Sequence, residues 1–283
     1  MIIVYLVGGL GNQMFCRALG LALEKRGYDV AYTTRALNCG PFAHLTVFSL
    51  GSFNCGGTGT LRIMDDVPPG HQVFKIHETS MRYNPAMLEP RSPTPQLPHL
   101  YIEMMGNWQT EKYFQDIAAE VRRGFQFTKD RQPTRQAQIY EEMIRVAPIS
   151  VAVHVRRGDY ESYPSTREHH GLLSLNYYKN AMKHIEGKIG PVRYFVFSDD
   201  LQWCEANMPG TIVKGTDKYD DLYLMSLCNH AIVANSSLSW WGAWLGDDKP
   251  NRIVVAPKRW LSNPDVDTSD VVPERWIKMG DDL

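Results

Sequence analysis

Short runs of apolar residues alternate along the chain with segments in which apolar residues recur at helical spacing. The first run, residues 2–7, is continuous and rich in β-branched side chains, which is typical of a strand buried on both faces of a parallel sheet. A glycine-rich break follows, residues 14–26 have the spacing of a helix, and residues 30–33 form a second apolar run. A strand, a glycine loop, a helix and a strand in this order predict the start of an α/β domain.

The same alternation returns in the second half of the chain. It predicts strands at residues 149–155, 194–198, 231–234 and 252–256, and helices at residues 174–188, 220–228 and 236–245. Residues 111–125 and 135–145 also have helical spacing, whereas residues 38–100 have weak periodicity and many prolines, so loops and short elements are expected there. The pattern predicts two α/β domains, residues 1–147 and 148–283, each built on a parallel sheet.

Composition limits the class of protein. The chain has 283 residues, of which 43% are hydrophobic and 22% are charged, as in ordinary globular proteins. Thirty Lys and Arg against 31 Asp and Glu give a formal net charge of −1, whereas a general nucleic-acid binder shows a basic excess. We therefore expect no nucleic-acid partner, although this balance is compatible with a local basic site.

The cysteines and the N-terminal segment indicate where in the cell the chain is expected. The cysteines are scattered without a CxxC pair, so free and mostly buried thiols are expected at Cys16, Cys39, Cys55, Cys204 and Cys228. The N-terminal apolar run has no basic flank and is too short for a signal peptide, and no run approaches the roughly 18 apolar residues of a membrane span. If the sequence is complete, the protein is expected in the cytoplasm, without an integral membrane span.

The most specific pattern is the run HVRRGDY at residues 154–160, directly after a predicted strand. Ligands of open α/β sheets bind at the carboxyl ends of strands, which is where this run lies. Alternation along an extended segment sends His154 and Arg156 to one side and Arg157 to the other. One arginine can then face an anion, for which its planar fork of donors is suited, while the other pairs with an acid such as Asp159. A solvated loop with an Arg–Asp turn is the alternative.

A second pattern, NSSLSWWGAWL at residues 235–245, follows the predicted strand at residues 231–234. Asn or Ser at such a junction is a favourable N-cap, and the free N–H groups of a helix N-terminus attract anions. Ser236 and Ser237 add hydroxyl donors, whereas Trp241, Trp244 and Leu245 are expected to fill the core.

The opening loop, GGLGNQ at residues 8–13, allows a ligand to approach the backbone closely. It differs from the dinucleotide-binding fingerprint, because Met14 stands in place of the third glycine and Thr33-Thr34-Arg35 in place of the acid that holds ribose. An NAD-dependent dehydrogenase is therefore disfavoured.

Candidate metal ligands are poorly placed. Asp265-Val266-Asp267 has the form in which some enzymes hold a nucleotide-bound cation, but it lies in a loop near the C-terminus, where an exposed acidic loop is the simpler interpretation. Asp199-Asp200 ends a predicted strand, yet a helix N-cap role accounts for it. We expect no metal site.

With these patterns in place, the sequence resembles the GDP-fucose-dependent, inverting α-1,2-fucosyltransferase family over most of its length. The resemblance is carried by six ordered blocks, GGLGNQMF at residues 8–15, GNWQTEKYF at 106–114, HVRRGDY at 154–160, FSDD at 197–200, NSSLSWWGAWL at 235–245 and PKRWL at 257–261. It implies a GT-B-like fold, in which two Rossmann-type domains with parallel sheets face each other across a cleft. It assigns GDP-fucose to residues 148–283 and the acceptor to residues 1–147.

The resemblance also implies roles for individual residues. Arg156 meets the β-phosphate of GDP-fucose, and Asp159 orients the arginines or moves a proton, so these two are the implied catalytic residues. The residues implied to bind the donor are Gly11, Asn12, Gln13, His154, Arg156, Asp221, Ser236 and Ser237. Among them Asp221 pairs with the guanine edge, His154 lies near the guanosine, and the two serines bind the diphosphate. GDP-fucose is the donor substrate, and no metal or other cofactor is required.

The expected reaction transfers L-fucose from GDP-β-L-fucose, with inversion, to the 2-hydroxyl of a terminal galactoside. The acceptor is a galactose-terminated glycan such as an O-antigen or an oligosaccharide, and a lipid-linked acceptor would place the protein at the periphery of the inner membrane. Asp159 and Glu161 are both candidate bases. Residues 38–100 match no family block closely, and Trp108 stands where Phe or Tyr is common, so the acceptor is the less determined substrate. The alternatives are a transferase that uses another nucleotide sugar and a non-catalytic protein that binds a GDP-sugar or a glycan.

Overall fold

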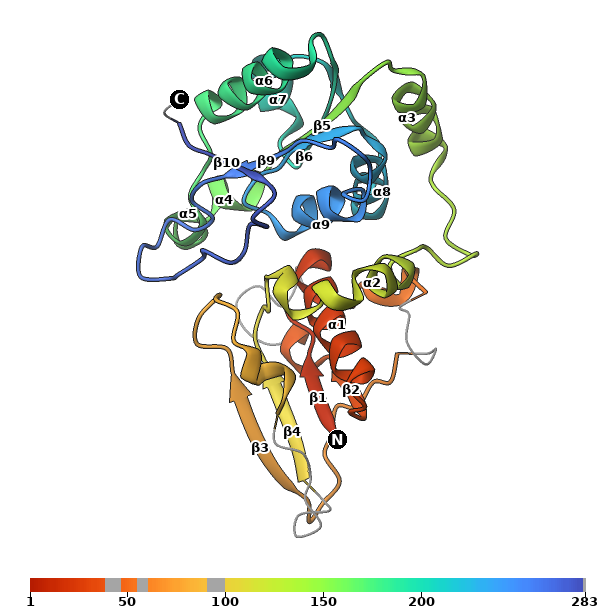
Figure 1. Ribbon diagram of the computed structural model, residues 1–283, viewed down its shortest axis with the longest axis vertical. Coiled ribbons are helices and arrows are strands. Elements are labelled where there is room, and N and C mark those ends of the chain that lie inside the picture. Colours follow the sequence, from red (N-terminus) through yellow and green to blue (C-terminus); the bar gives the residue numbers. More distant parts are fainter. Residues whose placement is uncertain (39–46, 55–60, 91–99, 282–283) are drawn as a thin grey trace. The chain divides into compact units, whose positions relative to one another are not determined.

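The computed structural model of the protein describes residues 1–38, 47–54, 61–90 and 100–281 (Figure 1). These residues form two compact units, each with its own parallel sheet. The first unit holds Met1–Gln132 together with Ser269–Val271, and the second holds Pro133–Thr268 together with Val272–Leu283. Both units are α/β, which confirms the fold class expected from the alternation of apolar runs.

The first unit contains one four-stranded sheet. Its strands are β1 (Ile2–Tyr5), β2 (Val30–Thr33), β3 (Gln72–His77) and β4 (Leu100–Met105). They pair in parallel in the order β2-β1-β4-β3. Its α-helices are α1 (Leu10–Lys25) and α2 (Ala118–Gly124), and its 3₁₀ helices are η1 (Arg35–Asn38), η3 (Leu50–Ser52), η4 (Pro85–Leu88), η5 (Glu111–Tyr113) and η6 (Gln115–Ile117). The strand–loop–helix–strand beginning predicted from the sequence is confirmed in β1, α1 and β2.

Two strands of this sheet were not predicted. β4 buries Ile102 and Met104, but Glu103 between them interrupts the apolar run. β3 is an edge strand whose side chains are mostly exposed, so it has no apolar pattern to detect. The helix expected at residues 111–125 was also wrong in its extent, because two 3₁₀ turns precede the α-helix that begins at Ala118.

The second unit contains the larger sheet. Its strands are β5 (Ser150–Val155), β6 (Arg193–Ser198), β7 (Thr211–Ile212), β8 (His230–Ile232), β9 (Val254–Pro257) and β10 (Ile277–Met279). They pair in parallel in the order β10-β9-β8-β5-β6-β7. Its helices are α3 (Arg135–Val146), α4 (Gly158–Ser162), α5 (Pro164–His170), α6 (Leu175–Ile189), α7 (Leu201–Asn207), α8 (Lys218–Leu227) and α9 (Ser237–Leu245). The strands and helices predicted after residue 149 are all present, and the missed ones are short.

The core of the second unit explains these elements. Every residue of β5 is buried, as expected for the central strand of a sheet that is covered on both faces. α6 buries Tyr177 and Tyr178 against β5, β6 and β8. Trp241 and Trp244 of α9 are fully buried, as predicted, and pack edge-to-face or stacked with each other and with Trp240, whereas Leu245 is only half-buried.

The boundary between the units falls at residues 132/133, whereas the sequence placed it at 147/148. The difference is α3, which belongs to the second unit because it is bonded to α8. The hydroxyl of Thr134, the N-cap of α3, donates to Asp220 at 2.6 Å, and the hydroxyl of Tyr223 donates to Glu141 at 2.9 Å. These tertiary contacts leave no signal in the periodicity of α3 itself.

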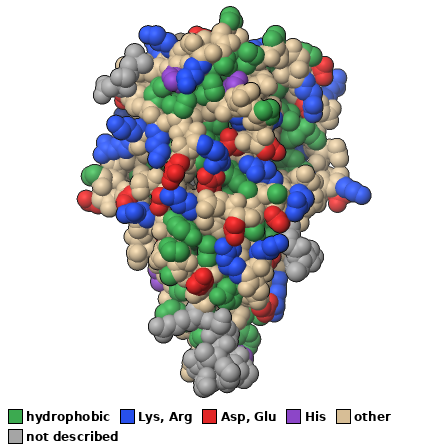
Figure 2. Space-filling model, viewed as in Figure 1, with side chains coloured by type: hydrophobic (Ala, Val, Ile, Leu, Met, Phe, Trp, Pro, Cys, Tyr) green, Lys and Arg blue, Asp and Glu red, His purple; other side chains and the backbone are tan. Residues whose placement is uncertain are grey.

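Surface and thiol chemistry agree with the composition. Figure 2 shows Lys and Arg side chains interspersed with Asp and Glu, with no broad basic area on that face. Cys16, Cys204 and Cys228 are free and buried, as predicted, while Cys39 and Cys55 lie outside the described residues. Within the described part of the chain, no helix combines the length and the apolar character needed to cross a membrane.

Candidate active site

The order of strands in the second unit creates a place for a ligand. From β5 the chain proceeds to β6 and β7 on one side, and it then crosses to β8 on the other side of β5. The connections that leave β5 and β8 therefore diverge, and ligands of open α/β sheets bind in the crevice at the carboxyl ends of such a pair. The HVRRGDY run begins with the last two residues of β5 and continues past its carboxyl end, and Ser236 follows β8.

Arg156 is held between two carboxylates at the end of β5. Its Nη2 lies 2.8 Å from Asp159 Oδ1, and its Nη1 lies 3.0 Å from Asp199 Oδ2. The guanidinium also lies over the ring of Tyr160, 5.4 Å from its centroid. Burial acts to lower the pKa of Arg156, but the charges of Asp199 and Asp159 outweigh burial and raise that pKa further above its ordinary value. Arg156 is therefore a fixed cation, and its side chain remains 32% exposed to a ligand.

Arg157 has a different environment. Its Nε lies 3.2 Å from Asp200 Oδ2, and its guanidinium lies over Trp203 at 4.5 Å from the ring centroid. Asp200 also caps α7, because its Oδ1 accepts a hydrogen bond from the N–H of Trp203 at 3.0 Å. The helix-cap interpretation of Asp200 is thus confirmed, and Arg157 binds α7 to the HVRRGDY loop.

The prediction that only one of the two arginines pairs with an acid is wrong. The sequence paired Asp159 with the arginine that does not face the ligand, but Asp159 contacts Arg156, the arginine proposed to meet the anion. The reason is that residues 158–162 form the short helix α4, which places Asp159 beside Arg156 three positions earlier. Both arginines are therefore paired with acids.

Asp199 is a site residue that the sequence did not single out as such. Its Oδ1 accepts a hydrogen bond from the N–H of Arg157 at 2.9 Å, while its Oδ2 pairs with Arg156. A Cβ at Gly158 would lie 2.8 Å from Asp199 Oδ2, so only glycine leaves this carboxylate in place. The FSDD block at the end of β6 was the available signal, and its first aspartate, Asp199, is the one that pairs with Arg156.

The N-terminus of α9 lies at the end of β8. Ser236 is the N-cap with an extended backbone, and its side chain makes no capping hydrogen bond. The first helical bond runs from the N–H of Trp240 to the carbonyl of Ser236, so the first-turn N–H groups have no intrahelical partner. Tyr160 connects this turn to Arg156, because its hydroxyl donates to the carbonyl of Asn235 at 3.2 Å.

His154 lies within β5, and its side chain is almost completely buried. Its Nδ1 has no hydrogen-bond partner among the described residues. Burial lowers the pKa of His154 to about 4, and this effect is opposed by Asp199 and reinforced by Arg156. The imidazole is therefore neutral at physiological pH, and its unpartnered nitrogen can accept or donate a hydrogen bond without carrying charge.

Three acids lie at the start of α8: Asp217, Asp220 and Asp221. Asp217 and Asp220 accept hydrogen bonds from backbone N–H groups, and Asp221 accepts one only from a side chain. Asp217 caps the helix by accepting from the N–H groups of Tyr219 and Asp220, each at 2.9 Å. Asp220 is bound to α3. Asp221 accepts one hydrogen bond, from the hydroxyl of Thr216 at 2.7 Å. Burial raises the pKa of Asp221 to about 6, even though that hydrogen bond lowers it.

Two residues of the glycine loop in the first unit, Asn12 and Gln13, differ in burial and in their hydrogen bonds. Gln13 is fully buried, and its amide bonds the carbonyls of Gly8 and Val47 and the N–H of Ser49 at 2.8–2.9 Å. Its side chain therefore supports the loop and does not fit the expected role of facing a phosphate. Asn12 is partly exposed and accepts a hydrogen bond from Gln109 Nε2 at 2.9 Å.

The loop after β4 adjoins this glycine loop. Trp108 has a positive φ of 55° and is fully buried. Glu78 stabilises that turn, since its Oε2 accepts from the N–H groups of Asn107 and Trp108 at 2.7 and 3.1 Å. Glu78 lies in the region without periodicity, so no sequence pattern identified it.

Metal-ligating side chains are not clustered in the part of the chain that is described. No group of three or more His, Cys, Asp or Glu residues could hold an ion within residues 1–38, 47–54, 61–90 and 100–281. Asp265 and Asp267 are exposed in the loop between β9 and β10.

Known proteins share both the fold and the sequence of this chain. A crystal structure of POFUT1 in complex with GDP-fucose superposes with a TM-score of 0.50 at 14% identity, covering 89% of this chain and 97% of that one, which supports the GT-B-like fold. The alpha-1,2-colitosyltransferase of Escherichia coli is 29% identical over 98% of both chains. The O-antigen biosynthesis glycosyltransferase WbnK of Escherichia coli is 36% identical over 50% of this chain and 48% of its own length.

Five of the six sequence blocks fall within the span of the family match, and GGLGNQMF at residues 8–15 lies before it. The model of the family described as Glycosyl transferase family 11 matches residues 94–279, a span that contains β5, the HVRRGDY loop, Asp199 and the N-terminus of α9. The resemblance first seen in the six blocks is therefore confirmed: the chain belongs to glycosyl transferase family 11 and is a glycosyltransferase.

Proposed function

We propose that this glycosyltransferase moves L-fucose from GDP-β-L-fucose to the 2-hydroxyl of a terminal galactoside, with inversion at the anomeric carbon. The observation that carries the proposal is the placement of Arg156, a cation fixed by two carboxylates at the strand ends where a ligand is expected. A relative that matches over 98% of its own length is named as an alpha-1,2-colitosyltransferase, which supports the α-1,2 linkage.

The second unit is proposed to bind the donor, and the first unit to contribute the acceptor side. Arg156 meets the β-phosphate, and the free N–H groups and hydroxyls of Ser236 and Ser237 bind the rest of the diphosphate. Asp221 suits the guanine edge, because two neighbouring N–H donors of guanine match the two oxygens of a carboxylate. His154 offers a neutral nitrogen to the guanosine. In the first unit, we retain Asn12 and the backbone of Gly11 as the groups that face the donor.

The proposed mechanism follows from where charge develops. As the glycosidic bond breaks, negative charge grows on the β-phosphate of the departing GDP while the sugar becomes oxocarbenium-like. Donors that are already fixed need no reorganisation at that moment, and removing one such donor typically costs 10²–10³-fold in rate. Arg156 is fixed in this sense by Asp159 and Asp199, and the α9 N-terminus is fixed by its fold.

Proton removal from the acceptor hydroxyl needs a base, and two carboxylates of α4, Asp159 and Glu161, are the candidates. Asp159 is engaged with Arg156, and Glu161 lies 3.4 Å from Arg157 and 3.6 Å from Arg167. We assign Asp159 chiefly to the orientation of Arg156. Glu161 has the more exposed carboxylate, with 44% of its side chain accessible, and it stays the alternative base.

The proposal is tested by incubating the protein with GDP-fucose and lactose, measuring GDP release and determining the linkage of the product by NMR. An α-1,2-fucosylated galactose is the expected product. Release of GDP without a new glycosidic bond, or a different linkage, contradicts the proposal. Unchanged activity in EDTA is expected as well, since the chain's own donors stabilise the leaving group; loss of activity that Mn²⁺ restores would contradict this.

A second donor is favoured by one observation. The alpha-1,2-colitosyltransferase of Escherichia coli, a relative that matches over 98% of its own length, is named for the transfer of colitose, so we propose a GDP-linked colitose as the second candidate donor. Competition between GDP-fucose and GDP-colitose at equal concentration separates them by the product formed. The second relative acts in O-antigen biosynthesis by name, and we propose an O-antigen or oligosaccharide acceptor, with a peripheral membrane position if that glycan is lipid-linked.

A further inference from the structure

The block PKRWL, residues 257–261, has no part in the donor site described above, yet it lines a cavity in the second unit. The cavity has a volume of about 630 Å³ and lies where β8, β9 and β10 end, at the same edge of the sheet as Arg156. We call it the β9–β10 pocket, and the residues that define it are His170, Tyr177, Asn235, Lys258, Arg259 and Met279. Its volume is that of an ordinary small-molecule site.

A buried amide in this pocket is only half satisfied. Asn235 is 3% exposed, and its Nδ2 donates to the carbonyls of His170 and Gly171 at 2.8 and 3.4 Å. These bonds fix the orientation of the amide, and its Oδ1 has no partner within the described residues. A buried carbonyl oxygen without a partner costs stability unless a ligand or water donates to it, and a sugar hydroxyl is such a donor.

Two cations are among the residues that line the pocket. Lys258 and Arg259 are exposed, and neither makes an ion pair within the described part of the chain. The pocket also contains one acid, Asp281, whose Oδ1 accepts a hydrogen bond from the hydroxyl of Ser174 at 2.5 Å. With two unpaired cations and one acid that is already bonded, the charge of the lining favours an anionic ligand.

The pocket is joined to the catalytic arginine through Tyr160. The ring of Tyr160 lies under Arg156 on one side and stacks on His170 at 4.5 Å between centroids, with 6° between the planes. Its hydroxyl donates to the carbonyl of Asn235. Tyr160 therefore contacts Arg156 as well as two residues that line the β9–β10 pocket, His170 and Asn235.

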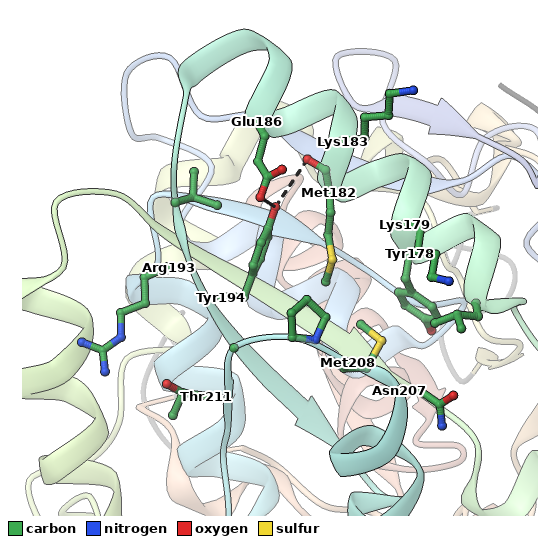
Figure 3. A pocket seen from close by; sticks show the side chains of 14 residues that line it. Tyr178, Lys179, Met182, Lys183, Glu186, Arg193, Tyr194, Asn207, Met208 and Thr211 are labelled. Carbon is green, nitrogen blue, oxygen red and sulfur yellow. Dashed lines mark hydrogen bonds between the residues drawn. The ribbon is translucent and has the colours of Figure 1, made fainter.

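The other large cavity of the second unit is not joined in this way. It lies between α6 and the amino ends of β6 and β7, at the opposite edge of the sheet (Figure 3). Figure 3 shows Tyr194 bonded through its hydroxyl to Glu186 and to the carbonyl of Met182. Lys179 and Lys183 also line this cavity, so it offers a matched control for the removal of two cations.

We propose that the β9–β10 pocket is an acceptor subsite that holds a negatively charged sugar residue beside the galactoside. This rests on the proposed fucosyl transfer, because it names the class of acceptor that the same enzyme uses. Asn235 receives a hydroxyl of that sugar, and Lys258 and Arg259 bind its carboxylate or phosphate. The natural acceptor is then an acidic glycan.

The test compares three acceptors that differ in one group: lactose, β-galactosyl-1,4-glucuronate and lactose 1-phosphate. The wild type is expected to have a KM about tenfold lower for at least one charged acceptor than for lactose. The double variant Lys258→Ala/Arg259→Ala is expected to lose that preference while kcat/KM for lactose stays within twofold. The control Lys179→Ala/Lys183→Ala, which removes two cations from the other cavity, is expected to keep the lower KM for the charged acceptor. A preference for the carboxylate or for the phosphate identifies which anion the acceptor carries.

Equal KM values for all three acceptors in the wild type would overturn the inference. A double variant that loses lactose and charged acceptors equally would overturn it too. If no acceptor is fucosylated, the proposed function fails, and the subsite is then judged by calorimetric titration of the same disaccharides into the protein. Tighter binding of a charged disaccharide that depends on Lys258 and Arg259 supports the subsite, and binding without that selectivity refutes it.

Discussion

Comparing the variants Arg156→Ala and Arg157→Ala distinguishes a loss of catalysis from a loss of stability. Both side chains sit in one loop, both are paired with two acids, and both lie over an aromatic ring. They differ in surroundings, because Arg157 binds α7 whereas Arg156 lies at the switch point between β5 and β8. The two variants therefore remove the same chemistry from adjacent positions.

The structure allows the size of each effect to be worked out. Arg156→Ala removes a fixed donor to the leaving phosphate, which is worth about 2.7–4 kcal/mol of transition-state stabilisation, or 10²–10³-fold in kcat/KM. It also leaves Asp159 and Asp199 without their shared cation. Partly exposed ion pairs of this kind contribute roughly 1 kcal/mol each, so we expect an unfolding free energy about 1–2 kcal/mol lower. Arg157→Ala removes comparable contacts and is expected to cost a similar amount of stability.

The assay measures GDP release with GDP-fucose and lactose at a temperature well below the midpoint of unfolding of both variants. Arg156→Ala is expected to lose at least 100-fold in kcat/KM, whereas Arg157→Ala is expected to stay within about tenfold of the wild type. Thermal unfolding followed by circular dichroism checks that the two variants are similarly folded. Activity of Arg156→Ala within threefold of the wild type, or equal losses in both variants, would refute the assignment of Arg156 to the phosphate.

Three further substitutions test separate contacts. Asp221→Asn is expected to raise the unfolding free energy above pH 4. Between about pH 4 and pH 6 the folded wild type keeps a proton on Asp221 that the unfolded chain releases, so the stability of the wild type falls as pH rises through this range. The stability advantage of the variant therefore grows from pH 4 to pH 6 and stays constant at higher pH. A pKa raised from 3.8 to about 6 corresponds to at most about 3 kcal/mol, and Tm measured against pH reports this difference. The same variant should bind GDP at least tenfold more weakly. An unchanged Tm would contradict the cost of the buried charge, and an unchanged GDP affinity would contradict the contact with guanine. Gly158→Ala should push Asp199 away from Arg156 and lower kcat about tenfold in a folded protein, and normal kcat would show that Asp199 does not hold the arginine. Gln13→Ala should lower the unfolding free energy by roughly 2–4 kcal/mol, measured in urea, with little change in KM for GDP-fucose, because its amide bonds only the protein.

The sequence predicted the second unit better than the first, and the reason lies in burial. β5 is buried on both faces and therefore appears as an uninterrupted apolar run, as does β1. β3 is an exposed edge strand, and β4 carries the buried Glu103, which pairs with Arg35 across the sheet. A tertiary ion pair of that kind has no local pattern, so the strand that contains it was missed.

The candidate site shows the same division between local and tertiary information. The placement of Arg156 at a strand end, and its separation from Arg157, followed from alternation along an extended segment. The pairing of Arg156 with Asp199 could not be predicted from that alternation. These residues are 43 positions apart and meet only when β5 and β6 pair side by side. The role of Gln13 was misjudged for a similar reason, since two of its partners, Val47 and Ser49, lie beyond the loop that contains it.

Asp159 can be assigned by separating kcat from KM. With Asp159 and Asp199 around one arginine, the cluster has a formal charge of −1, so the donor diphosphate is attracted by directed N–H groups rather than by net charge. A guanidinium has five N–H donors, and two ion pairs leave donors free for a phosphate. Asp159→Asn keeps an oxygen for Arg156 and removes one negative charge beside the diphosphate.

If Asp159 positions Arg156, this variant should bind GDP-fucose as well as the wild type or better, with a lower KM and a kcat reduced at most about tenfold. If Asp159 is the base that accepts the acceptor's proton, kcat should fall by at least 10²-fold with KM unchanged, since an amide cannot take up that proton. Glu161→Gln is the matched control, because Glu161 lies in the same helix and pairs with Arg157 and Arg167 instead. A large loss of kcat in Asp159→Asn together with normal activity in Glu161→Gln would refute the positioning role and assign the base to Asp159.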